Sequence, residues 1–201
     1  IESTFEIAGD QAVSDNLNSD AEYVLNEAAI DNSFAGNTPV NVSSTLGLLG
    51  CATVTITPLQ GFPKNITIDF GSGCSANASG ILRSRKIMIS LSDSLRKSGS
   101  VAVMTFDNYF VSGFKKEGKI TWTNTSNGGI KSWERKCEDG KITAPGGRYW
   151  LHTGTKEVVQ TQGSSTPSNL IDDVYSITGS STVTNSEGKS RTSTITEALE
   201  K

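Results

Sequence analysis

The stretch that decides the fold reads CATVTITPLQGFPKNITIDFGSGC over residues 51–74. It is followed by RKIMISL (85–91), SVAVMTFDNYFV (100–111) and GKITWTN (118–124). Most of these runs alternate β-branched or aromatic residues with polar ones, which is typical of strands with one apolar face. The connections are rich in Gly, Ser and Asn and too short for helical crossovers. The pattern predicts a mainly β protein: an antiparallel meander that forms a sandwich or a strongly curved sheet.

Two further observations extend this prediction along the chain. Residues 101–111 are apolar on both faces for most of their length, which favours a central strand covered on both sides. Weaker patterns predict later strands at about 129–137, 147–162, 173–184 and 190–198, with turns that include residues 138–141 between them. The stretch 51–201 is therefore expected to be an antiparallel β domain.

The first 50 residues are expected to hold a strand, a short helix and a loop that fold as one unit with the β domain. Ile1, Ser3, Phe5 and Ile7 alternate with polar residues and predict an N-terminal strand, a candidate donor to another sheet edge. Ser19 and Glu22 form a capping box, so one short helix is expected over about 20–30. Residues 31–50 are polar, and a loop with a short strand near 40–42 is expected there.

Two of the three cysteines lie at the ends of the first hairpin pattern. If the TVTIT and NITIDF runs pair about the Pro58–Pro63 turn, Cys51 and Cys74 fall roughly opposite each other at its open end. They form either a disulfide, which would place the protein outside the cytoplasm, or two free buried thiols. Cys137 is left over, either buried or paired outside this chain.

Composition narrows the classes of function. A net charge of -3 over 201 residues gives no sign of a nucleic-acid partner, and no apolar run is long enough for a membrane span. His152 is the single histidine, so three-histidine zinc sites are impossible within one chain. No Gly-x-Ser-x-Gly motif occurs, and paired carboxylates lie in predicted turns. We therefore expect no enzyme activity, no cofactor and no metal.

Aromatic residues offer the main hint of a binding surface. A stacking platform for sugar rings and ordinary core packing both remain open for five of them: Trp122, Trp133, Tyr149, Trp150 and Tyr175. Tyr149 and Trp150 are neighbours in a predicted strand, so one must face away from the core. These two residues and the nearby His152 are the candidate ligand contacts.

Several of these runs together resemble a known family. FPKNITIDFGSGC (62–74), the basic RSRK (83–86), GSVAVMTFDNYFVSGFKKEGKITWTN (99–124) and DDVYSITGSSTVTNSEG (172–188) are similar to the pattern of secreted or lipid-anchored surface proteins of Bacteroidetes-type bacteria. The resemblance covers 51–125 closely and 130–196 loosely, and it implies a structural rather than a reactive role for the motifs. Asp93-Ser94-Leu95 also resembles the short acceptor motif for O-linked glycans in such proteins, which makes Ser94 a candidate glycan site.

Two functions follow as hypotheses for an extracellular or cell-surface protein. The first is a non-catalytic structural or adhesive protein that self-associates by adding its N-terminal strand to the sheet edge of another copy. The alternative is a module that binds a glycan or a lipid, with Tyr149 and Trp150 in its site. A hydrolase that uses only carboxylates is a third, weaker hypothesis.

Overall fold

The protein is one long helix followed by an open antiparallel sheet. The structure, a computed structural model, describes residues 2–31, 49–75, 80–165 and 172–200. Helix α1 spans Glu2–Asp31. The strands are β1 (Thr53–Thr57), β2 (Lys64–Asp69), β3 (Cys74–Ser75), β4 (Leu82–Leu91), β5 (Val101–Val111), β6 (Phe114–Asn124), β7 (Ser132–Thr143), β8 (Tyr149–Gln162), β9 (Val174–Asn185) and β10 (Ser190–Glu200).

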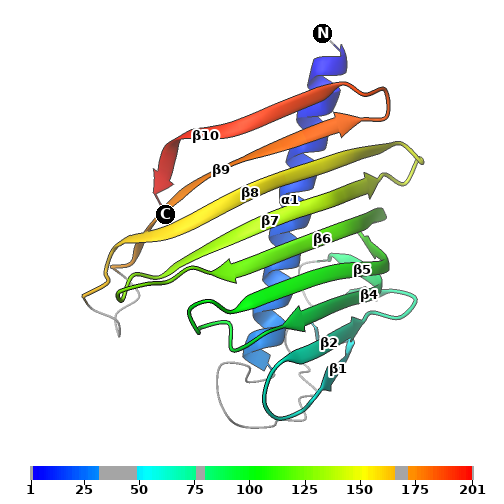
Figure 1. Cartoon of the computed structure of the whole chain (residues 1–201). Helices are drawn as coiled ribbons and strands as arrows, with labels where there is room; N and C mark the ends of the chain where they lie inside the picture. The colour runs from blue at the N-terminus through cyan, green and yellow to red at the C-terminus, as the bar shows by residue number, and fades with distance from the viewer. Residues whose placement is uncertain (1, 32–48, 76–79, 166–171, 201) are drawn as a thin grey trace.

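The strands confirm the predicted antiparallel meander. Their order in the sheet is β1-β2-β4-β5-β6-β7-β8-β9-β10, and the short β3 pairs with β4. Sequential strands are therefore spatial neighbours almost throughout, as expected for short turn connections. Figure 1 shows α1 lying across one face of this curved sheet, from beside β10 to beside β2. We call the face that α1 covers the inner face and the opposite one the outer face.

The N-terminal segment is a helix, and the predicted strand there is wrong. Ser3, Phe5 and Ile7 all lie in α1, while Ile1 lies outside the described residues. The helix expected over about 20–30 is correspondingly much longer, at 30 residues. Most of the loop expected over 31–50, with its short strand near 40–42, falls outside the described residues. An eight-residue alternation was too short to separate a strand from one end of a helix.

The buried side of α1 follows a spacing of three and four residues. The buried positions are Ile7, Asp10, Gln11, Ser14, Leu17, Asn18, Ala21, Val24, Leu25 and Ala28. This spacing brings one stripe of the helix onto the sheet. From Ala21 onward the stripe is apolar, whereas between positions 10 and 18 it is mostly polar. The two halves of α1 therefore contact the sheet through different kinds of interaction.

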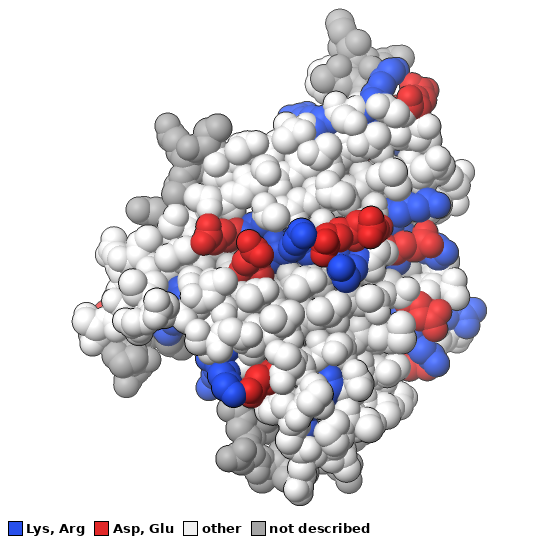
Figure 2. All heavy atoms as spheres, in the orientation of Figure 1, with Lys and Arg blue, Asp and Glu red and all other residues white. Residues whose placement is uncertain are grey.

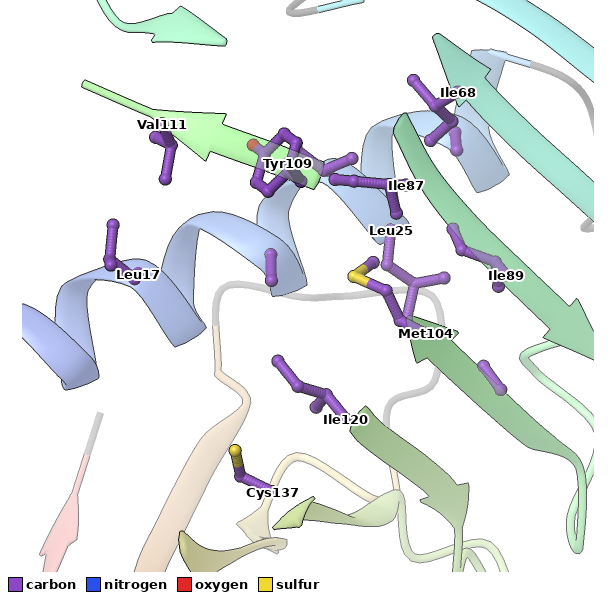
Figure 3. Packing of buried hydrophobic residues seen from close by; sticks show 14 of the residues in the cluster. Leu17, Leu25, Ile68, Ile87, Ile89, Met104, Tyr109, Val111, Ile120 and Cys137 are labelled. Carbon is purple, nitrogen blue, oxygen red and sulfur yellow. The ribbon is translucent and has the colours of Figure 1, made fainter. Parts of the chain in front are cut away.

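The apolar half of α1 contributes to the core. Leu25 lies among Ile87, Ile89 and Met104 of the inner face, as Figure 3 shows, and each of these side chains is at most 4% exposed. Burial of an aliphatic side chain of this size contributes roughly 2 kcal/mol to folding. This cluster fixes the C-terminal half of α1 on β4 and β5.

The polar half of α1 is held by partners that are distant in the sequence, on β6, on β8 and directly before β8. Trp150 Nε1 donates to Ser14 Oγ at 2.9 Å, and Lys116 Nζ donates to Asn18 Oδ1 at 2.7 Å. Arg148 forms an ion pair with Asp10 at 2.7 Å. Buried polar groups need such partners, because an unsatisfied one costs the full desolvation penalty. The register of α1 on the sheet is therefore specified by polar pairs as well as by packing.

Strand β5 is an inner strand of the sheet, but the expected cover on both faces is wrong. Ala102, Met104 and Val111 are buried on the inner face, while Val101 and Val103 on the outer face are partly exposed. Among the described residues, the helix covers one face of the sheet. Figure 2 shows the other, outer face, where uncharged residues surround a band of mixed charges. Lys136 and Glu138 of β7 form one of the ion pairs there, at 2.9 Å.

The predicted hairpin and its disulfide are confirmed. Strands β1 and β2 pair antiparallel, with Thr53 opposite Asp69, and Cys51 and Cys74 form a disulfide with a Cα–Cα distance of 5.7 Å. Cys137 is a free, buried thiol. Among the described residues, no helix has both the length and the apolar character that crossing a membrane requires.

Replacing Cys51 and Cys74 with Ala is expected to lower the free energy of unfolding by about 3 kcal/mol, because the bond closes a loop with a sequence separation of 23. Urea denaturation with and without a reductant checks this. Reductant should destabilise the natural protein and leave the double variant unchanged. An equal response of the two proteins would contradict the prediction.

Candidate functional site

Two cavities lie along one flank of α1, between the helix and the inner face of the sheet. The helix residues that line them include five that follow one another at intervals of three or four: Gln11, Asp15, Ser19, Glu22 and Asn26. This spacing places them along a single side of the helix. The first three line a cavity over β7 to β10, and the last two line a cavity beside β6 and β7. We call them the polar cavity and the tryptophan cavity.

The tryptophan cavity has a volume of about 300 Å³ and combines aromatic and polar walls. Trp122 and Trp133 come from β6 and β7, Ser100 precedes β5, and Glu22 and Asn26 come from α1. Trp133 is fixed by the ring of Tyr175, whose centroid lies 5.5 Å from its own. The volume of the tryptophan cavity lies at the lower end of the range for small-molecule pockets. It can hold a small ring against an indole.

Buried polar atoms without hydrogen-bond partners gather at the two cavities. Among the described residues four such atoms occur: Gln11 Oε1, Ser100 Oγ, Tyr109 OH and Trp122 Nε1. Three of them belong to residues that line a cavity: Ser100 and Trp122 the tryptophan cavity, and Gln11 the polar cavity. Buried groups of this kind are rare in folded proteins, and each needs an explanation. One explanation is a ligand that accepts a hydrogen bond from Trp122 Nε1 and forms another with Ser100 Oγ.

The outer wall of the tryptophan cavity is a loop that the fold holds in place. Asn124 Nδ2 donates to the carbonyl oxygen of Leu95 at 2.8 Å, and Asn124 Oδ1 accepts from the backbone N–H of Ser126 at 2.9 Å. Leu95 lines the cavity. Ser94, the candidate glycan acceptor, is its neighbour in this loop and is partly exposed. The cavity is therefore preformed, which lowers the entropic cost of binding.

The polar cavity has a volume of about 310 Å³ and a different character. Its lining includes Arg135 and Cys137 of β7, His152 and Lys156 of β8, and Asp15 of α1. In the register of β7 and β8, Arg135 lies opposite Lys156 and Cys137 lies opposite Gly154. A Cβ on Gly154 would lie 2.8 Å from the carbonyl oxygen of Ser180, so the glycine allows β8 and β9 to approach each other closely there. Most of the residues that line this cavity carry hydrogen-bonding or charged side chains.

Cys137 and His152 are the groups here most often associated with covalent catalysis. Cys137 Sγ lies 3.4 Å from His152 Nδ1. Burial raises the pKa of the Cys137 thiol, while burial and the nearby Lys116 and Arg135 cations lower the pKa of His152 to about 3. Burial also lowers the pKa of Lys116 to about 8. At neutral pH the thiol and the imidazole are thus both uncharged, unlike the thiolate of an activated cysteine nucleophile.

The three predicted contact residues do not meet in one site. Tyr149 is half-exposed on the outer face, where Lys141 Nζ lies 4.7 Å from its ring centroid. Trp150 points inward and is fully buried against Ser14 and Phe114, so Tyr149 is the member of the pair that faces away from the core. His152 is buried at the wall of the polar cavity. Successive residues of a strand face opposite sides, which separates Tyr149 from the other two.

The structure brings together a different set of residues. Trp122 and Trp133 were two of the five aromatic candidates, and they do line one cavity. Gln11, Ser100 and Arg135 were not predicted, because nothing local in the sequence marks them. One signal was present: the polar residues at three- and four-residue intervals along α1 indicate a helix with a polar buried side.

Among the described residues, no group of three or more His, Cys, Asp or Glu side chains is placed to hold a metal ion.

Comparison with known proteins reveals no relationship: no family model, curated protein or solved structure matches the chain.

Proposed function

We propose that the protein is a non-catalytic glycan-binding module that works outside the cytoplasm and holds a sugar ring in the tryptophan cavity. The observation that carries this proposal is the pair of unpartnered buried groups, Trp122 Nε1 and Ser100 Oγ, on two residues that line a cavity together with Trp133. Sugars match such a site because their hydroxyls hydrogen-bond in both directions while their C–H faces stack on aromatic rings.

The remaining polar groups of the cavity fit the same ligand. Glu22 offers carboxylate oxygens as acceptors, and Asn26 offers both donors and an acceptor. A lipid tail would leave these groups and the two unpartnered atoms without partners, at a cost of about 1–3 kcal/mol for each buried one. A glycan is therefore the better of the two ligand classes that the sequence suggested.

Two features support a location outside the cytoplasm. The Cys51–Cys74 disulfide is typical of oxidising compartments, and the resemblance to bacterial surface proteins implies the same location. Self-association by addition of an N-terminal strand is not supported, because Ser3, Phe5 and Ile7 lie in helix α1 and form no strand that could join another sheet. A structural or adhesive role would need another contact surface.

The chemistry of the cavities supports binding without turnover. The residues that line each cavity include one carboxylate, Glu22 in the tryptophan cavity and Asp15 in the polar cavity. Glycoside hydrolysis commonly needs two carboxyl groups on either side of the scissile bond. Cys137 and His152 are uncharged at neutral pH for the reasons given above. These features favour a recognition module over a hydrolase.

Trp133→Ala is expected to weaken glycan binding about 5- to 30-fold, because aromatic contacts of this kind contribute about 1–2 kcal/mol. A glycan array identifies the oligosaccharide with the strongest signal, and calorimetric titration with that oligosaccharide measures the loss. Tyr149→Ala removes a comparable ring from the outer face and should leave the affinity unchanged. Equal losses in the two variants, or an array without any signal, would overturn the proposed function.

Ser100→Ala separates binding from folding at the same site. The hydroxyl has no partner within the described residues, so its removal should leave the free energy of unfolding unchanged or slightly higher. The affinity for the array-identified oligosaccharide should fall, since the ligand loses a hydrogen bond to a buried group. Unchanged affinity would mean that Ser100 does not contact the sugar.

A further inference from the structure

The polar cavity contains two cations placed side by side. Arg135 of β7 and Lys156 of β8 are directly opposite each other in the antiparallel register, and both line the cavity. Residues opposite each other share one face of a sheet, and like charges in this arrangement repel and destabilise the pair. An anionic group between the two side chains would turn this repulsion into attraction.

Arg135 is short of partners although most of its side chain is buried. The side chain is 13% exposed, and the guanidinium makes no hydrogen bond to any described residue. Its one ion pair there is with Glu22, at 3.6 Å between Nη1 and Oε2, which is too long for a hydrogen bond. Lys156 likewise has no side-chain hydrogen bond or ion pair within the described residues. A guanidinium presents five N–H donors in a fork that matches a carboxylate or a sulfate.

Gln11 adds an acceptor on the opposite wall. Its Nε2 donates to Ser181 Oγ at 2.8 Å and to Asp15 Oδ1 at 3.2 Å, which fixes the orientation of the amide. Its Oε1 is buried without a partner. This atom needs a donor such as a hydroxyl, and a simple anion cannot provide one. The ligand of this cavity should therefore carry both an anionic group and a hydroxyl.

The two cavities are neighbours along the same flank of α1. Glu22 lines the tryptophan cavity, Arg135 lines the polar cavity, and these two side chains form the ion pair between them. In the sheet register Trp122 of β6 lies opposite Arg135 of β7, and Arg135 lies opposite Lys156 of β8. A row of side chains across three strands therefore connects the two cavities. An oligosaccharide lying along the flank would meet both cavities.

We propose that the polar cavity binds an acidic sugar, with its carboxylate or sulfate between Arg135 and Lys156 and a hydroxyl donating to Gln11 Oε1. The anionic group takes over the loose contact that Arg135 makes with Glu22. This deepens the proposed function, on which it rests, by naming the glycan class: an acidic oligosaccharide with a neighbouring ring in the tryptophan cavity.

The test uses the whole chain and an array that carries uronate, sulfated and neutral oligosaccharides. The strongest signals should come from acidic glycans. Calorimetric titration then compares the best ligand with its carboxyl-reduced or desulfated form, and the neutral form should bind at least tenfold more weakly. The stronger of the uronate and sulfated classes identifies the anionic group. Equal binding of the acidic and neutral forms would overturn the inference.

Arg135→Gln provides the residue-level test, with Lys136→Gln as a matched control. Both changes remove one positive charge from adjacent positions of β7, but Lys136 lies on the outer face. Arg135→Gln should weaken binding of the acidic ligand at least tenfold and make it less sensitive to salt, while Lys136→Gln should have no effect. Thermal unfolding of Arg135→Gln should occur at the same temperature or higher, since repulsion with Lys156 is relieved.

The failure of this inference can be distinguished from the failure of the proposed function. If Trp133→Ala abolishes binding while Arg135→Gln behaves like Lys136→Gln, the protein binds glycans but the polar cavity is not an acidic-sugar site. If the array gives no signal, the proposed function and the inference both fall. If Arg135→Gln alone abolishes binding, the polar cavity is the site and the tryptophan cavity is not.

Discussion

Asp20→Ala is expected to lower the free energy of unfolding by about 3–5 kcal/mol, because it leaves the charged Arg83 buried without its partner. Arg83 of β4 is 1% exposed, and its Nε and Nη2 atoms both donate to the carboxylate of Asp20. The hydroxyl of Tyr109 is buried beside the same carboxylate. Burial raises the pKa of Tyr109, and the nearby Asp20 raises it further. Urea denaturation followed by circular dichroism measures the loss.

Two further variants separate the ion pair from a general loss of acidic charge. Asp15→Ala removes an exposed carboxylate from the same helix and should cost well under 1 kcal/mol. Combining Asp20→Ala with Arg83→Met removes both charges and should recover most of the lost stability, as buried pairs often can be replaced by apolar residues. If Asp20→Ala is as stable as Asp15→Ala, α1 is not fastened through this pair.

The strands and the disulfide could be predicted because their signals are local. The alternation in residues 53–57 and 64–69, together with the turn residues between them, fixes a hairpin and brings Cys51 opposite Cys74. The later strands follow from similar patterns. A period of two needs only neighbouring residues to be visible, and short connections leave an antiparallel meander as the simplest topology.

The first half of α1 could not be predicted in the same way. Its buried stripe carries Asp10, Ser14 and Asn18, which a hydrophobic pattern does not count as buried. These residues are stable there because their partners, Arg148, Trp150 and Lys116, lie about a hundred residues or more away in the chain. Such partners are known only once the fold is known. The missed length of the helix is therefore a result of tertiary contacts that override local propensity.

The candidate site was partly visible and partly hidden. For the aromatic residues a sugar platform and core packing were both open: Trp122 and Trp133 line a cavity, whereas Trp150 packs against α1. The pairing of Arg135 with Lys156 could not be predicted, because a turn was expected at 138–141. In the structure these residues continue β7 through a bulge between Cys137 and Gly140. An extra residue in a strand changes the register beyond it, so the partner of Arg135 could not be derived.

Glycine at position 179 lines the polar cavity. It belongs to β9 and faces Lys156 in the register with β8. Its φ is +143°, and a Cβ placed there would lie 2.2 Å from the carbonyl oxygen of Thr155. Residues other than glycine rarely adopt this backbone conformation. The carbonyl oxygen of Thr155 belongs to the neighbouring strand β8, which cannot move independently of the sheet. The close approach of β8 and β9 at this point depends on the absence of a side chain.

Gly179→Ala is therefore expected to cost about 4 kcal/mol, combining backbone strain with displacement of β8. Gly9→Ala is the matched control: Gly9 lies inside α1 with nothing within 4 Å of an added Cβ, so the same substitution should stabilise the protein by about 1 kcal/mol. Urea denaturation of both variants measures the two effects, which should differ in sign. If Gly179→Ala unfolds at the same urea concentration as the natural protein, β8 and β9 can separate at low cost, and the floor of the polar cavity is adaptable rather than preformed. If it unfolds much earlier, as expected, the close approach of β8 and β9 beside Lys156 requires glycine at position 179.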